Sequence, residues 1–316
     1  MKNNLFITLL LFYLPFLSIS QEIKNMETEV VIPTNSVSIK GTLLNTNSEE
    51  KAPLVIIIPG SGPTDRDGNN VMMKNNSLKY LAENLNDRNI ATYRYDKSVL
   101  SYSKEDSKNI DSLSFDVFIN EAKYVINYFK QTEHYSKIIV AGHSQGSLVG
   151  MVASKEIADG FISIAGAGKS IDEILVEQIE KQAPFLKADT EKIVRELKKG
   201  NTVAEVNPNL ISLFNKQIQP FLISWIKYDP QSELEKLAIP VLIVNGTKDI
   251  QVSIEQAELL HKAKANSQLN LIENMNHLFK EINGDTNENM LSYSNPNLPV
   301  MEELINIITT FVYEIK

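Results

Sequence analysis

The chain has 316 residues, of which 43% are hydrophobic and 22% are charged, and its formal net charge is −8. These values are typical of a soluble globular protein with a substantial core, and they exclude a disordered or collagen-like chain. A net negative charge without a run of basic residues argues against nucleic acid or anionic lipid as a partner. The chain has no cysteine, which excludes disulfides, thiol nucleophiles and cysteine-bound metals.

The N-terminus has the pattern of a secretory signal peptide. Lys2 supplies a positive charge, residues 5–17 form an apolar run, and Ser18-Ile19-Ser20 provides small residues at the spacing that signal peptidase reads. We therefore expect residues 1–20 to be cleaved and Gln21 to begin a periplasmic or secreted protein. The alternative is a membrane anchor, but this run is shorter than the roughly 20 apolar residues of a spanning helix. No stable membrane span is expected after cleavage.

Short β-branched runs alternate with helical patterns along residues 21–316. This alternation predicts an α/β domain with a mostly parallel sheet and helices on both faces. The first two runs resemble an antiparallel pair, whereas residues 54–58 form the continuous apolar run of a strand buried on both faces. The expected strands are 29–32, 37–44, 54–58, 90–95, 137–141, 161–165, 241–244 and 269–272. The expected helices are about 77–87, 114–131, 145–157, 253–264 and 300–315.

One stretch, from about residue 170 to 237, contains no good strand. Apolar residues recur there at helical spacing, for example at Ile171, Ile174 and Leu175. A helical insert between two strands is expected to form a cap over the carboxyl edge of the sheet, where open α/β sheets bind ligands. Its large apolar side chains are candidates for a substrate pocket, with the core of the cap as the alternative for each. They are Phe214, Phe221, Leu222 and Trp225.

The segment Gly142-His143-Ser144-Gln145-Gly146 lies between an expected strand and an expected helix. The pattern G-x-S-x-G is weak alone, but in this context it predicts a nucleophile elbow, a strained turn whose glycines prevent collisions. The turn would expose the Ser144 hydroxyl above the sheet at a helix N-terminus, which favours developing negative charge. The alternative is a glycine-rich turn capped by a serine.

A serine hydroxyl needs a base to become a good nucleophile. Four histidines are present, so the base can be sought by elimination. His143 lies inside the elbow, His134 precedes its strand and so lies at the wrong edge, and His261 belongs to a helical pattern. His277 follows the last expected strand, where this type of fold places its base.

The acid is expected after the preceding strand, and Asp249 follows residues 241–244 through a short turn. Asp229 and Asp285 also lie in expected loops, but position favours Asp249. The predicted triad is thus Ser144, Asp249 and His277. The histidine would take the serine proton and later give it to the leaving group, while the aspartate would orient the ring.

Such a reaction also needs donors for the oxyanion. One should be the backbone N–H of Gln145, directly after the nucleophile, and the other should come from the loop after the third strand. That loop reads Pro59-Gly60-Ser61-Gly62-Pro63, and the N–H of Ser61 is the candidate, with a plain turn as the alternative. The sequence contains no metal-ligand spacing and no dinucleotide fingerprint, so no metal and no cofactor are expected.

Asp65-Arg66-Asp67-Gly68 follows this loop at once. Alternating acid and base next to an active site could bind a polar group of a substrate. More often such a run forms local ion pairs that shape the loop, and this structural role is favoured here.

Segments spread over nearly all of residues 21–316 resemble a group of bacterial α/β-hydrolase esterases that includes thermophilic esterase D-type enzymes. The resemblance implies the α/β-hydrolase fold and hydrolysis of short acyl esters without a cofactor. Where that group has an Arg-Gly pair, this chain has Ser98-Val99-Leu100. The segments that carry the resemblance are Gly60-Ser61-Gly62-Pro63-Thr64-Asp65-Arg66-Asp67-Gly68, Arg94-Tyr95-Asp96-Lys97, Gly142-His143-Ser144-Gln145-Gly146-Ser147, Trp225-Ile226-Lys227-Tyr228-Asp229-Pro230, Gly246-Thr247-Lys248-Asp249 and Met275-Asn276-His277.

The leading hypothesis is therefore a carboxylic ester hydrolase that forms an acyl-enzyme on Ser144 with a small-molecule ester. An exopeptidase or amidase could use the same triad, with Asp65 or Asp67 binding a free amine. An acyl thioesterase is less favoured because coenzyme A thioesters are scarce outside the cytoplasm. A non-catalytic binding protein is disfavoured by the complete triad. The sequence determines neither the physiological substrate nor the oligomeric state.

Overall fold

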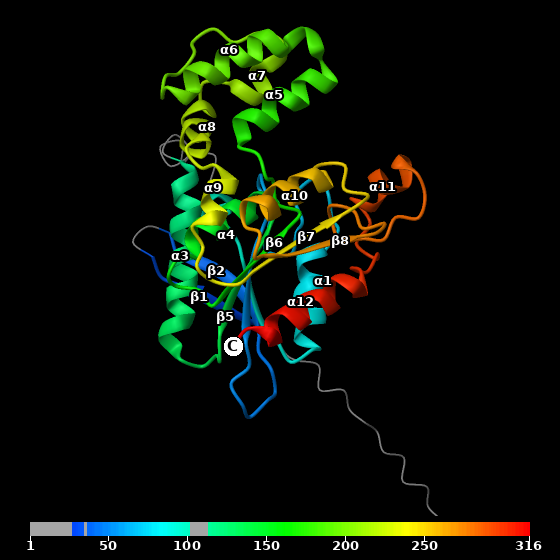
Figure 1. The fold of residues 1–316 in the computed structure, drawn as a ribbon. Coiled ribbons are helices and arrows are strands. Elements are labelled where there is room, and N and C mark those ends of the chain that lie inside the picture. Colours follow the sequence, from blue (N-terminus) through cyan, green and yellow to red (C-terminus); the bar gives the residue numbers. More distant parts are fainter. Residues whose placement is uncertain (1–26, 35–36, 102–112) are drawn as a thin grey trace, which may run out of the picture.

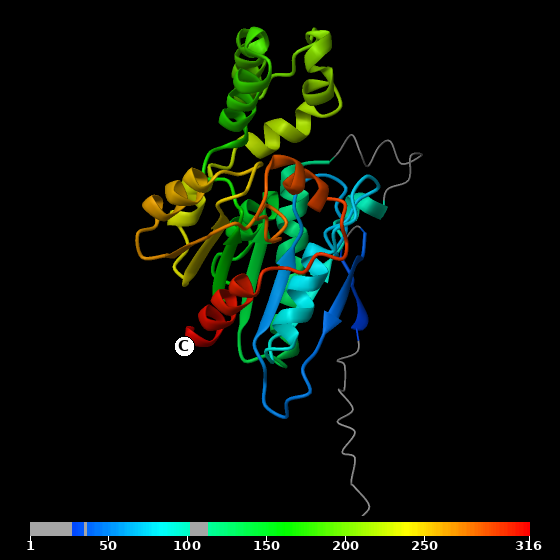
Figure 2. The same ribbon diagram turned by 90° about the vertical axis from the view of Figure 1, so that its right-hand side faces the viewer.

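The computed structural model describes residues 27–34, 37–101 and 113–316, so the predicted signal peptide lies outside the described residues. A sheet with strand order β1-β2-β4-β3-β5-β6-β7-β8 forms the centre, and helices cover both of its faces (Figures 1 and 2). The pairs β1·β2 and β2·β4 are antiparallel. From β4 to β8 all neighbouring strands are parallel. The predicted mostly parallel α/β architecture is thus confirmed.

The central strands have the burial that their continuous apolar sequences predict. Every residue of β3, β5 and β7 is buried, because helices cover these strands from both sides, whereas the edge strand β8 is partly exposed. The strands are β1 (Glu27–Ile32), β2 (Ile39–Leu44), β3 (Leu54–Ile58), β4 (Ala91–Tyr95), β5 (Ile138–His143), β6 (Gly160–Ile164), β7 (Val241–Gly246) and β8 (Gln268–Ile272).

The helices around the sheet form two hydrophobic layers. α3 (Phe115–Thr132) and α4 (Gln145–Ala153) pack on one face, while α1 (Ser77–Asn86) and α12 (Glu302–Glu314) pack on the other. α10 (Ile254–Ala263) joins the layer of α3 and α4. A short helix that was not predicted, α11 (Thr286–Ser292), forms in a polar stretch. A 3-10 turn, η1 (Ser98–Ser101), follows β4 where the chain departs from the esterase group.

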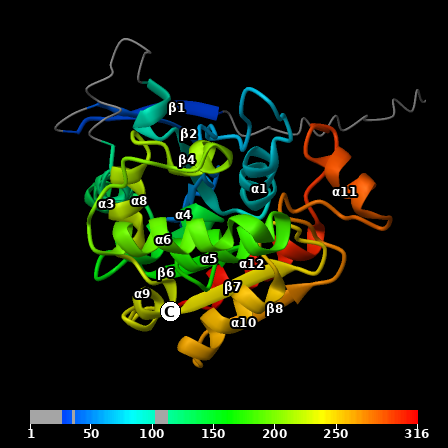
Figure 3. The same cartoon turned by 90° about the horizontal axis from the view of Figure 1, so that it is seen from above.

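The segment between β6 and β7 is helical. It contains α5 (Ile171–Gln182), η2 (Pro184–Leu186), α6 (Lys187–Lys198), η3 (Pro208–Leu210), α7 (Ile211–Phe214), α8 (Gln219–Ile226) and α9 (Pro230–Glu235). The helices α5 to α8 enclose a hydrophobic cluster of their own and stand above the sheet domain (Figures 1 and 2). Seen from above, α5 and α6 lie over the middle of the sheet domain (Figure 3). These four helices are called the cap below.

The strand order locates the functional edge. From β3 the chain proceeds to β4 on one side, and then crosses to β5 on the other side of β3. The loops after β3 and β5 therefore diverge at one edge of the sheet, and this switch point is where open α/β sheets bind ligands. Among the residues that the structure describes, no helix is both long and apolar enough to span a bilayer.

Candidate active site

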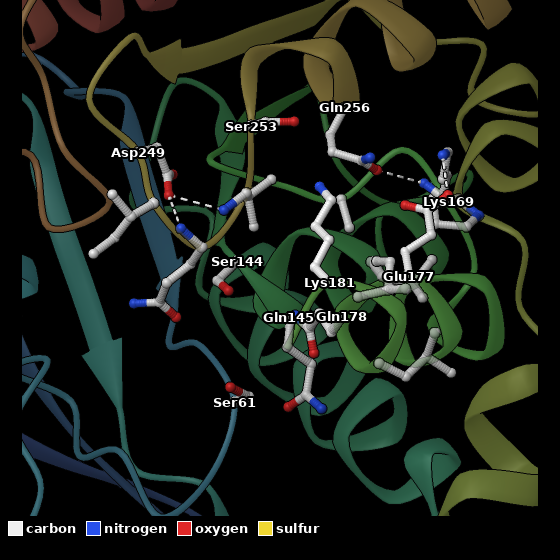
Figure 4. A pocket seen from close by; sticks show the side chains of 18 of the residues that line it. Ser61, Ser144, Gln145, Lys169, Glu177, Gln178, Lys181, Asp249, Ser253 and Gln256 are labelled. Atoms are coloured by element: carbon white, nitrogen blue, oxygen red, sulfur yellow. Dashed lines mark hydrogen bonds and ion pairs between the residues drawn. The ribbon is translucent and has the colours of Figure 1, made fainter. Parts of the chain in front are cut away.

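Ser144 lies at the turn between β5 and α4, and the turn explains the two glycines around it. Its φ is 53° and its ψ −120°, a conformation that costs a non-glycine residue about 1–3 kcal/mol. A Cβ atom on Gly142 would lie 2.2 Å from the carbonyl oxygen of Gly146. A Cβ on Gly146 would lie 2.5 Å from the carbonyl oxygen of Ile58. The turn leaves the Ser144 side chain facing a cavity at the sheet edge (Figure 4).

His277 and Asp249 meet at this edge because they follow the neighbouring parallel strands β8 and β7. The Nδ1 atom of His277 lies 2.7 Å from the Oδ2 atom of Asp249. The other carboxylate oxygen accepts hydrogen bonds from the backbone N–H groups of Gln251 and Val252 at 2.8 and 2.9 Å. Both side chains are almost completely buried. The carboxylate thus fixes the ring orientation and leaves Nε2 for other partners.

Ser144 and His277 line a common small cavity of about 110 Å³, together with Gly60 and Ser61. In the described part of the chain, the Ser144 hydroxyl makes no hydrogen bond to the imidazole, whose bonded partner is Asp249. Serine–histidine contacts of this kind often tighten only in the complex with substrate. The structure thus brings Ser144 and His277 to one cavity, and Asp249 is bonded to His277 behind it.

The remaining histidines occupy other positions. His143 is buried beside His277, the predicted base, and its Nε2 donates a hydrogen bond to the backbone carbonyl of that residue at 3.0 Å. Burial, and after it the nearby His277, holds the pKa of His143 well below its ordinary value. His143 is therefore a neutral support for the His277 backbone. His134 is exposed, and His261 on α10 contacts the hydroxyl of Ser267 at 2.9 Å.

The two rival aspartates have structural roles at helix ends. The Asp229 carboxylate accepts from the backbone N–H of Ser232 at the start of α9. The Asp285 carboxylate accepts from the N–H groups of Asn287 and Glu288 at the start of α11. Side-chain caps of this kind satisfy backbone donors that a helix leaves unpaired. Neither carboxylate is bonded to His277, whereas Asp249 is.

The predicted oxyanion donors lie on either side of Ser144. Ser61 and Gln145 line the same cavity as the serine (Figure 4). The loop of Ser61 passes closely over the elbow, since a Cβ on Gly60 would lie 3.3 Å from that of Ser144. Within the described residues, neither backbone N–H is hydrogen-bonded inside the protein. Two unpaired donors beside a nucleophile form the arrangement that an oxyanion requires.

Comparisons of the sequence relate this chain to known hydrolases. A family model described as serine aminopeptidase, S33, matches residues 73–220. Esterase EstD from Thermotoga maritima is 26% identical over 258 residues, which are 76% of this chain and 57% of that protein. The chain therefore matches little more than half the length of this curated relative.

Solved structures match over almost the whole chain. Est1E from Butyrivibrio proteoclasticus has a TM-score of 0.57 at 18% identity, covering 90% of this chain and 99% of its own. The α/β hydrolase GrgF from Penicillium sp. sh18 has a TM-score of 0.60 at 14% identity, covering 92% and 99%. The chain therefore has the α/β-hydrolase fold. The predicted resemblance to the esterase D group is confirmed by the match to EstD.

In the structure the acid–base run after Ser61 forms internal contacts. The Arg66 guanidinium donates to Asp96 at 2.7 and 3.0 Å, and Arg94 donates to Asp67 at 2.7 Å. The Asp65 carboxylate accepts from the backbone N–H of Asp67 at 2.9 Å. None of these side chains lines the two cavities that contain Ser144. The contacts fit the structural role favoured from the sequence and leave no carboxylate of the run free for a substrate amine.

The larger of the two cavities at Ser144 has a volume of about 480 Å³ and lies between the sheet edge and the cap. Its cap side is formed mainly by α5, which contributes apolar, charged and amide side chains (Figure 4). Lys169, just before α5, forms an ion pair with Glu177. Lys181 makes no ion pair with any described carboxylate. The cap-side lining residues are Lys169, Ile171, Ile174, Glu177, Gln178, Lys181, Gln182 and Trp225.

Three of the four predicted pocket residues do not line this cavity. Phe214 and Leu222 are buried in the core of the cap, and Phe221 packs with its ring 5.8 Å from that of Phe118. In the structure these three side chains pack in the cap core or against α3. Trp225 does line the cavity, and its ring also stacks on Phe115 at 5.3 Å.

The polar side of the cavity was not predicted. Ile171, Ile174, Gln178 and Lys181 recur at helical spacing and therefore lie on one face of α5. The expected helix was recognised by its apolar residues, and the mixed face that includes Gln178 and Lys181 went unnoticed. In the described residues, no group of three or more metal-binding side chains is present.

Proposed function

We propose that the protein hydrolyses carboxylic esters through an acyl-enzyme on Ser144. One observation carries this proposal. A serine in a strained elbow faces a cavity together with a histidine whose Nδ1 contacts the buried carboxylate of Asp249 at 2.7 Å. The match to EstD supports an ester as the substrate.

In this mechanism, the Oγ atom of Ser144 attacks the ester carbonyl carbon while Nε2 of His277 takes the hydroxyl proton. The N–H groups of Ser61 and Gln145 receive the negative oxygen of the tetrahedral intermediate. Its collapse breaks the bond to the alkoxy oxygen, and His277 gives the proton to the departing alcohol. A water molecule, deprotonated by His277, then attacks the acyl carbon. The bond to Ser144 Oγ breaks, His277 returns the proton to this oxygen, and the acid is released. Asp249 stabilises the imidazolium in both halves.

A second candidate is an exopeptidase, which the match to the serine aminopeptidase model favours. Such an enzyme would need a carboxylate for the free amine of the substrate. The carboxylates considered from sequence, Asp65 and Asp67, are engaged elsewhere, and Glu177 in the cavity is paired with Lys169. The ester substrate is therefore the better-supported choice.

We further propose a preference for short acyl groups. The cavity of about 480 Å³ is lined along α5 by the polar side chains Glu177, Gln178 and Lys181 as well as by Ile171 and Ile174. A long alkyl chain would desolvate these groups without pairing them, which is unfavourable. We expect kcat/KM to fall beyond an acyl length of about six carbons, a limit taken from pockets of a few hundred Å³.

A panel of p-nitrophenyl esters from acetate to laurate, run beside aminoacyl p-nitroanilides, tests these points together. Hydrolysis of the short esters with little release from the anilides is the expected outcome. A higher kcat/KM for the anilides would favour the exopeptidase instead. Mass spectrometry after brief mixing with a slowly deacylated ester should find the acyl group on the peptide containing Ser144, and acylation at another residue would reject this nucleophile.

A further inference from the structure

Lys97 is a buried lysine whose side chain ends at the loop of the proposed oxyanion hole. Its residue is 3% exposed, two positions beyond the end of β4. The ammonium group donates to the backbone carbonyl of Gly60 at 2.7 Å and to that of Gly62 at 2.8 Å. It also lies 5.0 Å from the centre of the Phe118 ring. Lysine is rarely buried to this extent, because desolvation of its charge is costly unless partners replace water.

The two carbonyl groups flank Ser61, and one of them shares a peptide group with its N–H. Gly60 C=O and Ser61 N–H belong to the same planar unit, which is trans because the described residues contain no cis peptide bond. In a trans peptide the carbonyl and the N–H point in opposite directions. The contact of Lys97 with Gly60 O therefore directs the Ser61 N–H away from the lysine.

On the other side of this peptide lies the nucleophile. A Cβ on Gly60 would be 3.3 Å from that of Ser144, and Ser61 borders both cavities that contain this serine. Gly62 has a φ of +70°, and a Cβ on it would meet no atom within 4 Å, so side-chain packing does not hold that part of the loop. The hydrogen bonds from Lys97 thus hold this segment, together with one from the Thr64 hydroxyl to the carbonyl of Ser61 at 2.8 Å.

We propose that Lys97 is a positioning residue that orients the Ser61 N–H towards the oxyanion formed at Ser144. This inference rests on the proposed function and identifies how one oxyanion donor is held. A single ammonium nitrogen suits the task, because it carries three donors that can reach two carbonyl oxygens at once.

The charge of Lys97 adds to this geometric effect. Hydrogen bonds from a charged donor are about twice as strong as neutral ones. A positive charge at the carbonyl end also polarises the peptide and makes its N–H a better donor. Burial lowers the pKa of Lys97 to about 8, and Glu121 on α3 partly opposes this change, so the ammonium form predominates at neutral pH.

The test compares Lys97→Met with Lys280→Met. Lys280 is equally buried, lies 4.9 Å from the Tyr80 ring and donates to the carbonyl of Leu298, which belongs to no part of the oxyanion loop. Burial lowers its pKa to about 8 as well. Comparing the two variants therefore distinguishes the effect of losing a buried ammonium group from the effect of losing the hydrogen bond to Gly60. Each variant is measured well below its own melting temperature.

For Lys97→Met we expect kcat for a short p-nitrophenyl ester to fall about 10- to 100-fold with KM within about threefold. Complete loss of an oxyanion donor costs about 10²- to 10³-fold, and a misdirected donor retains part of its effect. The rate of Ser144 phosphonylation by a fluorophosphonate should fall in parallel, because its phosphoryl oxygen also needs the hole. Lys280→Met should stay within about threefold of the unmodified protein in both assays.

Equal kcat values for the two variants would overturn the proposal and leave Lys97 with a structural role only. Phosphonylation of Ser144 without hydrolysis of any ester in the unmodified protein would reject the proposed function, while the phosphonylation rates would still test Lys97. If Lys97→Met does not fold, Lys97→Arg is measured in its place, because arginine keeps the positive charge but holds its donors at different positions. A kcat at least fivefold lower at unchanged KM supports positioning, and an unchanged kcat rejects it.

Discussion

The two walls of the cavity differ in how firmly their residues are held. The sheet-side wall consists of Ser61, Ser144, Gln145, Asp249 and His277, whose positions follow from tight turns and hydrogen bonds to backbone. The cap-side wall consists mainly of the α5 side chains Ile171, Ile174, Glu177, Gln178, Lys181 and Gln182. Of these, Gln178, Lys181 and Gln182 are long and exposed, and Lys181 forms no ion pair with a described carboxylate. The reaction is therefore expected to depend on the sheet side, and the choice of substrate on the cap side.

The attachment of the cap supports this division. The cap has its own hydrophobic cluster and packs on α3 through aromatic rings, with Trp225 stacked on Phe115. The hydroxyl of Ser224 accepts a hydrogen bond from the N–H of Phe115 at 2.7 Å. None of the triad side chains takes part in these contacts. Substitutions in the cap core should thus lower stability without altering the order of reactivity among substrates.

The largest expected effect is on the sheet side, at the nucleophile. Ser144→Ala should lower kcat/KM for a short ester by about 10⁴-fold or more, since a triad nucleophile is needed for covalent catalysis. A fluorophosphonate probe should no longer label the protein. The matched control is Ser147→Ala. Ser147 lies on α4, close after the elbow, and its buried hydroxyl is hydrogen-bonded to that of Ser163 on β6 at 2.7 Å. The free energy of unfolding of Ser147→Ala should fall by about 1 kcal/mol, and this variant should keep its activity. Persistent labelling of Ser144→Ala would contradict the assignment.

The next effect concerns the carboxylate. Asp249→Asn should lower kcat about 10³- to 10⁴-fold, because an amide no longer fixes the tautomer or stabilises the imidazolium. Asp285→Asn changes another loop aspartate, but asparagine caps a helix as well as aspartate does. That variant should keep both its activity and its melting temperature. Similar losses of kcat in the two variants would mean that the assignment of the acid is wrong.

The sequence predicted the sheet-side wall well because short-range rules determine it. Parallel strands bring their carboxyl ends to one edge, so the residues after β5, β7 and β8 had to lie near each other. The same rule explains why His277 and Asp249 are in contact in the structure. The elbow glycines reflect local backbone collisions, which a five-residue motif already encodes.

The cap-side wall was harder to predict because it depends on how helices turn relative to one another. Phe221, Leu222 and Trp225 lie within five residues on α8, yet their environments differ. Phe221 faces α3 and Leu222 faces the cap core, whereas Trp225 lines the cavity and also stacks on α3. Hydrophobicity alone does not separate these environments. The rotation of α8 is set by tertiary packing, which one sequence does not reveal.

A smaller expected effect tests whether side chains in the cap core and side chains that line the cavity have separate roles. Phe214→Ala should lower the free energy of unfolding by about 3–5 kcal/mol, since the ring is completely buried. Its acyl-length profile, measured where the protein is folded, should not change. Trp225→Ala should alter that profile and lose less stability, because its ring is only partly buried. Chain-length profiles and denaturant titrations on both variants check this. A changed profile in Phe214→Ala would show that the cap core also shapes the substrate site.

The smallest expected effect concerns the charge of Lys181. This side chain borders the cavity and forms no ion pair with a described carboxylate, although Glu255 is close enough to interact with its charge. An ester with a distal carboxylate should therefore be favoured over its neutral methyl-ester counterpart. Lys181→Gln should lower this ratio of kcat/KM values about two- to fivefold, because exposed charge pairs contribute at most about 1 kcal/mol. The difference should shrink in high salt, which screens exposed charges. Lys192→Gln removes an exposed lysine on α6 that does not line this cavity, and it should leave the ratio unchanged. The same ratio in both variants would show that the charge of α5 does not reach the bound ester.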